Sequence, residues 1–244
     1  MFLRQKRPPT IFHITHQKAG SQWIYYIFEL LIPKRIVAPI VGQDQFLRER
    51  VITGACYPTI YLPKEKFETV SIPANHRKFV IIRDLRDTLV SFYFSTKYSH
   101  PIIHKNIKKT RDKLNSLSKE ESLIHLMKRF EKHHAVIQDS WINSGEMIFK
   151  YEELIEDETG QLLKILKHCQ IDKSEKKMLK AIAKSSFKKR NGGRQLGEEN
   201  KNNHFRKGVP GDWRNHFSEP VKSNFKEKFG NLLIKTGYEK NLNW

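Results

Sequence analysis

The sequence predicts an α/β protein in which a parallel sheet is enclosed by helices on both faces, a three-layer sandwich. Short apolar runs rich in β-branched and aromatic residues alternate with longer stretches of helical periodicity. Two of these runs, at residues 11–15 and 78–82, are each followed directly by a turn and an amphipathic helix. Continuous apolar runs are typical of strands buried on both faces of a parallel sheet. We expect residues 1–244 to form one domain.

The first strand-turn-helix unit spans residues 11–31. Its turn, residues 16–22, contains Gly20, which lets the backbone approach a ligand closely. Unpaired amides at a helix start favour anions, and Lys18 and Ser21 would add to that effect. A P-loop-like phosphate-binding loop is therefore predicted, although an ordinary unit with a solvated Lys18 fits this segment about as well. The chain has no Gly-Lys dipeptide and no Rossmann fingerprint, which disfavours an ordinary nucleoside triphosphatase.

The next part of the chain contributes the second and third strands. Prolines and mixed charge indicate a connection at residues 33–51, with a short strand at 35–38 as one option. We expect the second strand at residues 50–55, ending at Cys56-Tyr57-Pro58, and then a short helix at 64–67 and a loop at 73–77. The third strand is the apolar run KFVII at residues 78–82.

The remaining chain is mostly helical. Asp84 is suited to cap a helix that follows the third strand at once. Residues 98–115 are basic and turn-rich, which indicates a mobile surface segment. We then expect a long helix at 118–142, a strand at 146–150, helices at 157–167 and 174–184, a polar loop at 187–211 and a last helix at 219–235.

The chain is strongly basic, with a net charge of +19 from 45 Lys+Arg against 26 Asp+Glu. Such a surface attracts polyanions, phosphorylated small molecules or acidic membranes, so peripheral membrane association stays open. Basic clusters occur at residues 105–111, 173–180 and 188–194, and charge runs of this kind are commonly solvated faces. Two cysteines, no apolar leader and no run of about 20 apolar residues predict a cytoplasmic protein without a membrane span.

Four separated segments carry the candidate chemistry. In a parallel sheet the strand ends at Lys18 and Arg83 meet at one edge, where such sheets bind ligands. The segments are KAGSQW at 18–23, IIRDLRDTLVSFYF at 81–94, MIFKYEELIED at 147–157 and RKGVPGDWRNHF at 206–217. In this order the segments resemble the motifs of sulfotransferases that use 3′-phosphoadenosine 5′-phosphosulfate (PAPS).

The resemblance implies transfer of a sulfuryl group from PAPS to a hydroxyl or amine, with no metal. Lys18 would neutralise charge on the leaving oxygen, and Arg83 would bind the 3′-phosphate together with Ser91, eight residues further on. Trp23 would stack on adenine, its alternative being a core position, and Ser185-Ser186-Phe187 would frame the base. The implied donor-binding residues are Lys18, Ala19, Gly20, Ser21, Gln22, Trp23, Arg83, Ser91, Tyr151, Phe187, Arg206, Lys207 and Gly208.

The resemblance leaves the catalytic base unassigned. Gln17, Ala19 and Gln22 replace the family's usual proline, serine and threonine. Many cytosolic members carry a histidine in a His-Leu-Pro-like segment after the second strand, where this chain offers Cys56-Tyr57-Pro58, and a neutral thiol is a poor base. His16 is the first substitute. The other candidates, each of which has an ordinary surface role as an alternative, are Asp44, Glu49 and His76.

Two other functions remain open on the sequence alone. The net charge and residues 188–194 also suit a polyanion-binding module, and a missing base also suits a PAPS-binding relative without catalysis. No obligatory nucleic acid is expected. The acceptor, a small molecule or a saccharide, would be bound by residues 43–46, 98–115 and part of 190–204, and the oligomeric state is undetermined. Pairs of histidines that are close in the sequence lack the accompanying ligands of a metal site, so no metal site is expected.

Overall fold

The computed structural model describes residues 7–40, 45–103 and 105–244. Within them lies a four-stranded parallel sheet with the order β2-β1-β3-β4. The strands are β1 (Thr10–Thr15), β2 (Cys56–Ile60), β3 (His76–Ile82) and β4 (Met147–Lys150). β1 and β3 run in register from Thr10 opposite His76 to Thr15 opposite Ile81. The predicted parallel sheet enclosed by helices is confirmed, and three of its strands lie where the sequence places them.

The predicted second strand at residues 50–55 is wrong, because β2 begins only at Cys56. Pro58 was expected to end the strand, yet it lies inside it. β2 is the edge strand of the sheet and has a neighbouring strand, β1, on one side. Pro58 has no N–H to donate, and an edge strand tolerates this because one of its sides is not paired with a strand. The short strand expected at residues 35–38 is reduced to a single bridge between Ile36 and Cys56, after the 3₁₀ turn Pro33–Arg35.

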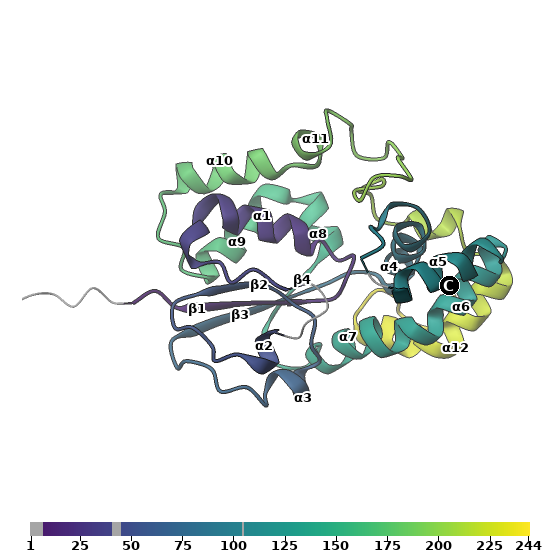
Figure 1. Cartoon of the computed structure of the whole chain (residues 1–244), viewed down its shortest axis with the longest axis horizontal. Helices are drawn as coiled ribbons and strands as arrows, with labels where there is room; N and C mark the ends of the chain where they lie inside the picture. Colours follow the sequence, from purple (N-terminus) through teal and green to yellow (C-terminus); the bar gives the residue numbers. More distant parts are fainter. Residues whose placement is uncertain (1–6, 41–44, 104) are drawn as a thin grey trace, which may run out of the picture.

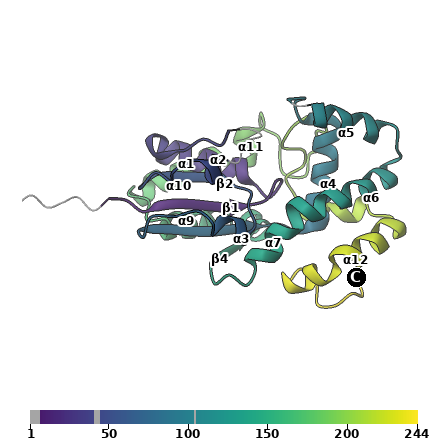
Figure 2. The ribbon, with the colours of Figure 1, turned by 60° about the horizontal axis from the view of Figure 1, so that its bottom comes forward.

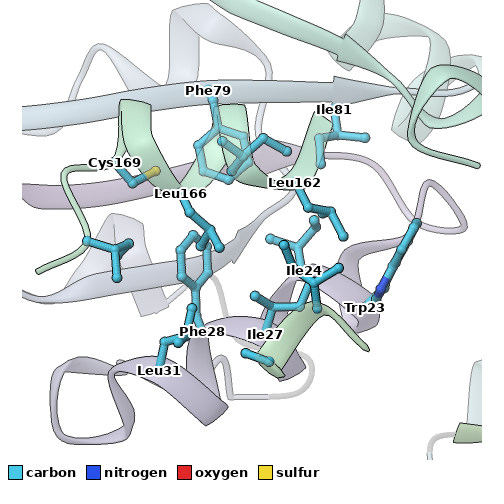
Figure 3. Packing of buried hydrophobic residues seen from close by; sticks show 14 of the residues in the cluster. Trp23, Ile24, Ile27, Phe28, Leu31, Phe79, Ile81, Leu162, Leu166 and Cys169 are labelled. Carbon is cyan, nitrogen blue, oxygen red and sulfur yellow. The ribbon is translucent and has the colours of Figure 1, made fainter. Parts of the chain in front are cut away.

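Helices cover both faces of the sheet (Figure 1). One layer contains α1 (Ser21–Leu31), α9 (Glu158–His168) and α10 (Glu175–Ser185). Figure 3 shows Phe28 of α1 and Leu166 of α9 packing below Phe79 of β3 in this layer. The opposite layer contains α2 (Gln45–Arg48), α3 (Lys64–Phe67) and α7 (Val136–Trp141), whose apolar residues pack on the other face of β1 and β3. Burying each large apolar side chain contributes roughly 1.5–3 kcal/mol.

A separate helical group lies beyond the carboxyl ends of the strands (Figures 1 and 2). Its core joins α4 (Leu85–Phe94), α6 (Lys119–Phe130) and α12 (Glu219–Lys235). The Asp84 side chain caps α4 by accepting from the Arg86 amide at 2.8 Å, as expected from the sequence. The expected helix 118–142 is continuous through a π-helical segment, Glu131–Ala135, into α7. This group forms one side of the hollow at the end of the sheet.

Three segments are more ordered than the sequence suggested. The basic segment 98–115 begins in the last residues of the π-helical turn Ser95–Ser99 and contains the helix α5 (Lys105–Asn115). A short helix, α8 (Tyr151–Glu156), begins directly after β4. The polar loop 187–211 opens with α11 (Phe187–Arg190) and leads to the 3₁₀ turn Asp212–Asn215. None of the helices in the described part of the chain is both long and apolar enough to cross a membrane.

Candidate active site

A cavity of about 790 Å³ lies at the carboxyl ends of the strands. It is bounded by the turns after β1, β2 and β3, by α8 and by the loop 187–211. Twelve of the thirteen residues predicted to bind the donor line it, namely Lys18, Gly20, Ser21, Gln22, Trp23, Arg83, Ser91, Tyr151, Phe187, Arg206, Lys207 and Gly208. Ala19 differs, because it is fully buried in the apolar core below α1.

The turn after β1 has an unusual backbone. Lys18 has φ 71° and Gly20 has φ 86°, both in the left-handed region. Glycine is required at position 20, since a Cβ there would also lie 3.1 Å from the Tyr151 ring. The turn leads straight into α1 at Ser21, without a side-chain cap on the first amides. Those amides therefore stay available to an anion in the cavity.

Lys18 lies in a cation-rich environment. Burial, followed by the charges of Arg83 and Arg206, lowers the pKa of Lys18 from 10.5 to about 7. An anion bound in the cavity would offset this repulsion and restore the charged ammonium group. The electrostatics of the cavity thus favour a ligand with several negative charges.

Arg83 connects the first turn to α8. Its Nη1 donates to the Lys18 carbonyl at 2.9 Å, and its guanidinium carbon lies 4.4 Å from the centre of the Tyr151 ring. Burial alone would lower the pKa of Arg83, but the neighbouring Tyr151 and carboxyl groups, Asp87 foremost, raise it above its ordinary value. Its Nε is buried and has no partner among the described residues. Arg83 is thus a fixed, permanently charged group with an unused donor.

Aromatic side chains form another part of the cavity wall. Trp23 is 8 % exposed, and its Nε1 donates to Ser185 Oγ at 2.9 Å. Tyr151 packs edge-on against Trp23, with ring centres 6.5 Å apart. Gly208 lies so close to Phe187 that a Cβ would come within 2.7 Å of its ring. Trp23 therefore belongs to the core and also presents a surface to the cavity, so the two roles expected for it are compatible.

The loop 187–211 is fastened to α4 through Asp87. This carboxylate accepts from the Gly211 amide at 2.5 Å and from the Trp213 amide at 2.9 Å. Just before this anchor, Arg206 pairs with Glu199 and Asp212, and Lys207 Nζ lies 2.6 Å from Asp212. Two cations that line the cavity are thereby held in place by carboxylates.

Comparison with known proteins assigns the family. The sequence model of a family described as the sulfotransferase domain matches residues 8–237. The chain belongs to the sulfotransferase family. It is similar to 3-alpha-hydroxysteroid sulfotransferase of Cavia porcellus, with 24% identity over 84% of this chain and 77% of that protein. It is also similar to sulfotransferase 1E1 of Rattus norvegicus, with 23% identity over 91% of this chain and 83% of that protein.

Solved structures agree with this assignment at the level of the fold. Mouse sulfotransferase SULT7A1 complexed with PAP superposes with a TM-score of 0.65, at 19% identity, over 97% of this chain and 87% of that one. Retinol dehydratase in complex with androsterone and the inactive cofactor PAP gives a TM-score of 0.59, at 14% identity, over 93% and 81%. The fold class predicted from the alternating strand and helix patterns is therefore confirmed, as are the family and the enzyme class implied by the four motifs.

His16, the first candidate for the base of this sulfotransferase, is fully buried and does not line the cavity. Its Nδ1 lies 3.0 Å from the Gln17 carbonyl, and its Nε2 lies 2.7 Å from Gln138 Nε2. Burial lowers the pKa of His16 to about 4. Gln138 also donates to the Arg83 carbonyl at 2.5 Å. These contacts fit a neutral histidine that fixes the backbone beside Lys18 and Arg83, and they argue against proton transfer from an acceptor.

Among the described residues, the other candidates for the base also lie away from the cavity. Glu49 is exposed after α2 and accepts from Gln45. Cys56 is fully buried, and burial raises the pKa of its thiol. His76 is the first residue of β3, so it lies at the amino end of the strand, whereas Arg83 follows the carboxyl end. Its Nδ1 lies 2.8 Å from the Pro73 carbonyl oxygen. Asp44 lies outside the described residues.

Tyr61 is a cavity residue that the sequence analysis missed. It is the first residue after β2, and its hydroxyl lies 2.7 Å from Ser21 Oγ. With β2 ending at Ile60, the segment after the second strand reads Tyr-Leu-Pro at residues 61–63, a tyrosine variant of the His-Leu-Pro-like segment. A second strand at residues 50–55 would have put this segment at Cys56-Tyr57-Pro58 instead. Three histidines also line the cavity, namely His100 and His204, from segments expected to bind the acceptor, and His133, which the sequence analysis did not assign to the site.

Proposed function

We propose that this sulfotransferase transfers the sulfuryl group of PAPS to a hydroxyl or amine of a small organic acceptor. The observation that carries the proposal is the hydrogen bond from Arg83 to the Lys18 carbonyl. It holds the anion-binding turn and a permanent cation at one cavity, as a donor with 5′ and 3′ phosphate groups requires. The PAP present in the two solved structures supports the same donor class.

In this proposal the first turn binds the 5′ end of the donor. The amides of Gly20, Ser21 and Gln22 and the Ser21 hydroxyl hold the 5′-phosphate at the start of α1. Lys18 neutralises the charge that develops on the bridging oxygen as its bond to sulfur breaks. The new bond from the acceptor atom to sulfur forms on the opposite side. Positioning and electrostatics therefore supply the catalysis, and no step requires a metal.

The 3′ end of the donor is proposed to lie between α4 and the loop 187–211. Arg83 and Ser91 contact the 3′-phosphate from one side, and the segment Arg206-Lys207-Gly208 covers it from the other. Trp23 and Phe187 enclose the adenine, with Tyr151 beside it. This assignment uses every predicted donor-binding residue that lines the cavity.

A largely apolar part of the cavity is proposed to bind the acceptor. Its apolar side chains come from residues 37–40, from α2, from β2 and the turn after it, and from α4, namely Val37, Pro39, Ile40, Phe46, Tyr57, Ile60, Leu62 and Phe92. Residues from each segment expected to bind the acceptor also line the cavity, including Gln45, His100 and His204. An apolar wall favours a compact hydrophobic acceptor over a saccharide. The steroid named for the Cavia porcellus relative is of this kind.

The polyanion-binding alternative receives less support. Within the cluster at residues 188–194, Arg190 packs 4.5 Å from the Phe205 ring centre and donates to the Gln22 carbonyl. Arg194 donates to the backbone carbonyls of Glu198, Phe205 and Arg206. These arginines serve to hold the loop together and are not free to contact a polyanion.

Calorimetry with 3′,5′-bisphosphoadenosine (PAP) tests the donor site. We expect saturable one-to-one binding by the wild-type protein, and transfer of labelled sulfate from PAPS to an acidic phenol in the same preparation. No binding at micromolar protein concentrations would overturn the proposed function.

PAP binding should also take up protons above neutral pH. In the free protein the pKa of Lys18 is about 7, so near pH 8 Lys18 is mostly neutral. Bound phosphates raise this pKa, so Lys18 gains a proton and affinity falls as the pH rises above about 7. Titrations in buffers of different ionisation enthalpy should show net uptake approaching one proton, and Lys18→Met should remove most of it. Equal heats in all buffers would contradict the low pKa.

A further inference from the structure

The position of Tyr61 defines what the enzyme can do with the acceptor's proton. β2 lies beside β1, and the two strands are parallel, so the residues that follow them meet at one edge of the sheet. There the Tyr61 hydroxyl is 2.7 Å from Ser21 Oγ, on the turn that carries Lys18. Tyr61 is nevertheless 36 % exposed, and the cavity is the space it faces. Its hydroxyl therefore lies between the proposed donor site and the apolar acceptor site.

A tyrosine at this point cannot accept the proton of an alcohol. Although part of the Tyr61 side chain is exposed, desolvation of its hydroxyl raises the pKa of Tyr61 above its ordinary value of 10, so the hydroxyl stays protonated near neutral pH. A neutral phenol can donate a hydrogen bond to an oxygen atom of the acceptor, but it is not a base. Tyr61 can thus orient an acceptor that carries negative charge on its attacking atom.

The cavity histidines do not replace a base at this position. The charge of Lys18, followed by burial, lowers the pKa of His204 to about 4, which makes its ring a weak proton acceptor. His133 belongs to the π-helical segment of the long helix and is largely exposed. Partial desolvation, followed by the charge of Arg129, lowers its pKa. His100 directs its Nδ1 to the Pro101 carbonyl at 2.8 Å. None of them is held against Ser21 as Tyr61 is.

We propose that Tyr61 occupies the place of the proton-accepting residue, and that this sulfotransferase therefore acts on phenols already ionised near neutral pH and not on aliphatic alcohols. The inference rests on the proposed function. The phenolate oxygen forms the new bond to sulfur, and the bond between sulfur and the bridging oxygen of PAPS breaks. The electron pair of the broken bond stays on the 5′-phosphate of PAP. No proton moves in this step, whereas an alcohol would have to lose one to a base.

The test compares three acceptors with PAPS at about pH 8. They are 4-nitrophenol, which is largely ionised, 4-methylphenol, whose pKa is close to the roughly 10 of a tyrosine side chain, and cyclohexanol. Without a general base, kcat/KM should fall by at least about 100-fold from 4-nitrophenol to 4-methylphenol, and cyclohexanol should give no detectable ester. Similar kcat/KM values for 4-nitrophenol and cyclohexanol would overturn the inference.

Variants at Tyr61 separate its role from that of the fold. Tyr61→Phe should lower kcat/KM for 4-nitrophenol about tenfold, the effect of one hydrogen bond to a charged atom, with PAP affinity within about threefold of wild type. Tyr61→His should raise transfer to 4-methylphenol at least tenfold, increasing as the new imidazole loses its proton. Tyr25→His, on α1 outside the cavity lining, is the matched control and should change neither acceptor preference nor PAP affinity.

Two results would count against Tyr61 in particular. Loss of transfer to 4-methylphenol in His204→Gln, with PAP binding and transfer to 4-nitrophenol retained, would identify His204 as the base and overturn the inference. PAP binding without transfer to any ionised phenol would also overturn it, while leaving the donor site intact. Absence of PAP binding would instead overturn the proposed function and this inference with it.

Discussion

Lys18→Ala should lower the turnover number with PAPS by about 10²–10³-fold, the usual effect of removing one group that stabilises charge in a transition state. PAP lacks the sulfuryl group, and its 5′-phosphate can still contact the amides at the start of α1. PAP affinity should therefore fall by less than about tenfold. The pKa of about 7 supports this expectation, because Lys18 becomes fully charged only when negative charge is placed beside it.

Single-turnover transfer to an ionised phenol, together with calorimetry on the same preparations, measures both quantities. Lys184→Ala is a matched control, because Lys184 is an exposed lysine of α10 outside the cavity lining. Unchanged turnover in Lys18→Ala would contradict the role proposed for the ammonium group. Equal losses of turnover and PAP affinity would show that Lys18 binds the donor equally in the ground and transition states.

The parts of the fold that could be predicted are those where local signals agree. The apolar run before Arg83 is a buried central strand, and Asp84 caps the helix after it as its side chain allows. The turn at Lys18 was recognised because small residues stand between a strand pattern and a helix pattern. In each case the deciding residues are neighbours in the sequence.

The failures have a common physical cause, since each depends on contacts between distant segments. Whether Pro58 ends a strand depends on β2 being an edge strand, which only the sheet order determines. His16 lies next to the anion-binding turn in sequence, yet Gln138, 122 residues away, holds its ring in the core. A second strand ending before Cys56 also leaves Tyr61 well beyond the strand end, although Tyr61 follows β2 directly.

Arg83→Ala should weaken PAP binding by about 2–3 kcal/mol, or roughly 30- to 150-fold in Kd, because it removes charged hydrogen bonds to the 3′-phosphate. The same side chain also holds the Lys18 carbonyl and packs on the Tyr151 ring, so the free protein should lose stability too. A loss of about 1–2 kcal/mol corresponds to roughly 2–8 °C in the melting temperature.

Arg83→Lys distinguishes the two effects, because lysine keeps the charge but cannot donate to the Lys18 carbonyl and to a phosphate in one planar arrangement. We expect Arg83→Lys to recover less than half of the lost binding free energy. Arg48→Ala, a substitution at an exposed arginine of α2, should leave PAP affinity unchanged. If Arg83→Ala melts earlier but binds PAP with wild-type affinity, the guanidinium supports the fold alone, and the 3′-phosphate must be bound by Arg206 and Lys207 from the opposite wall.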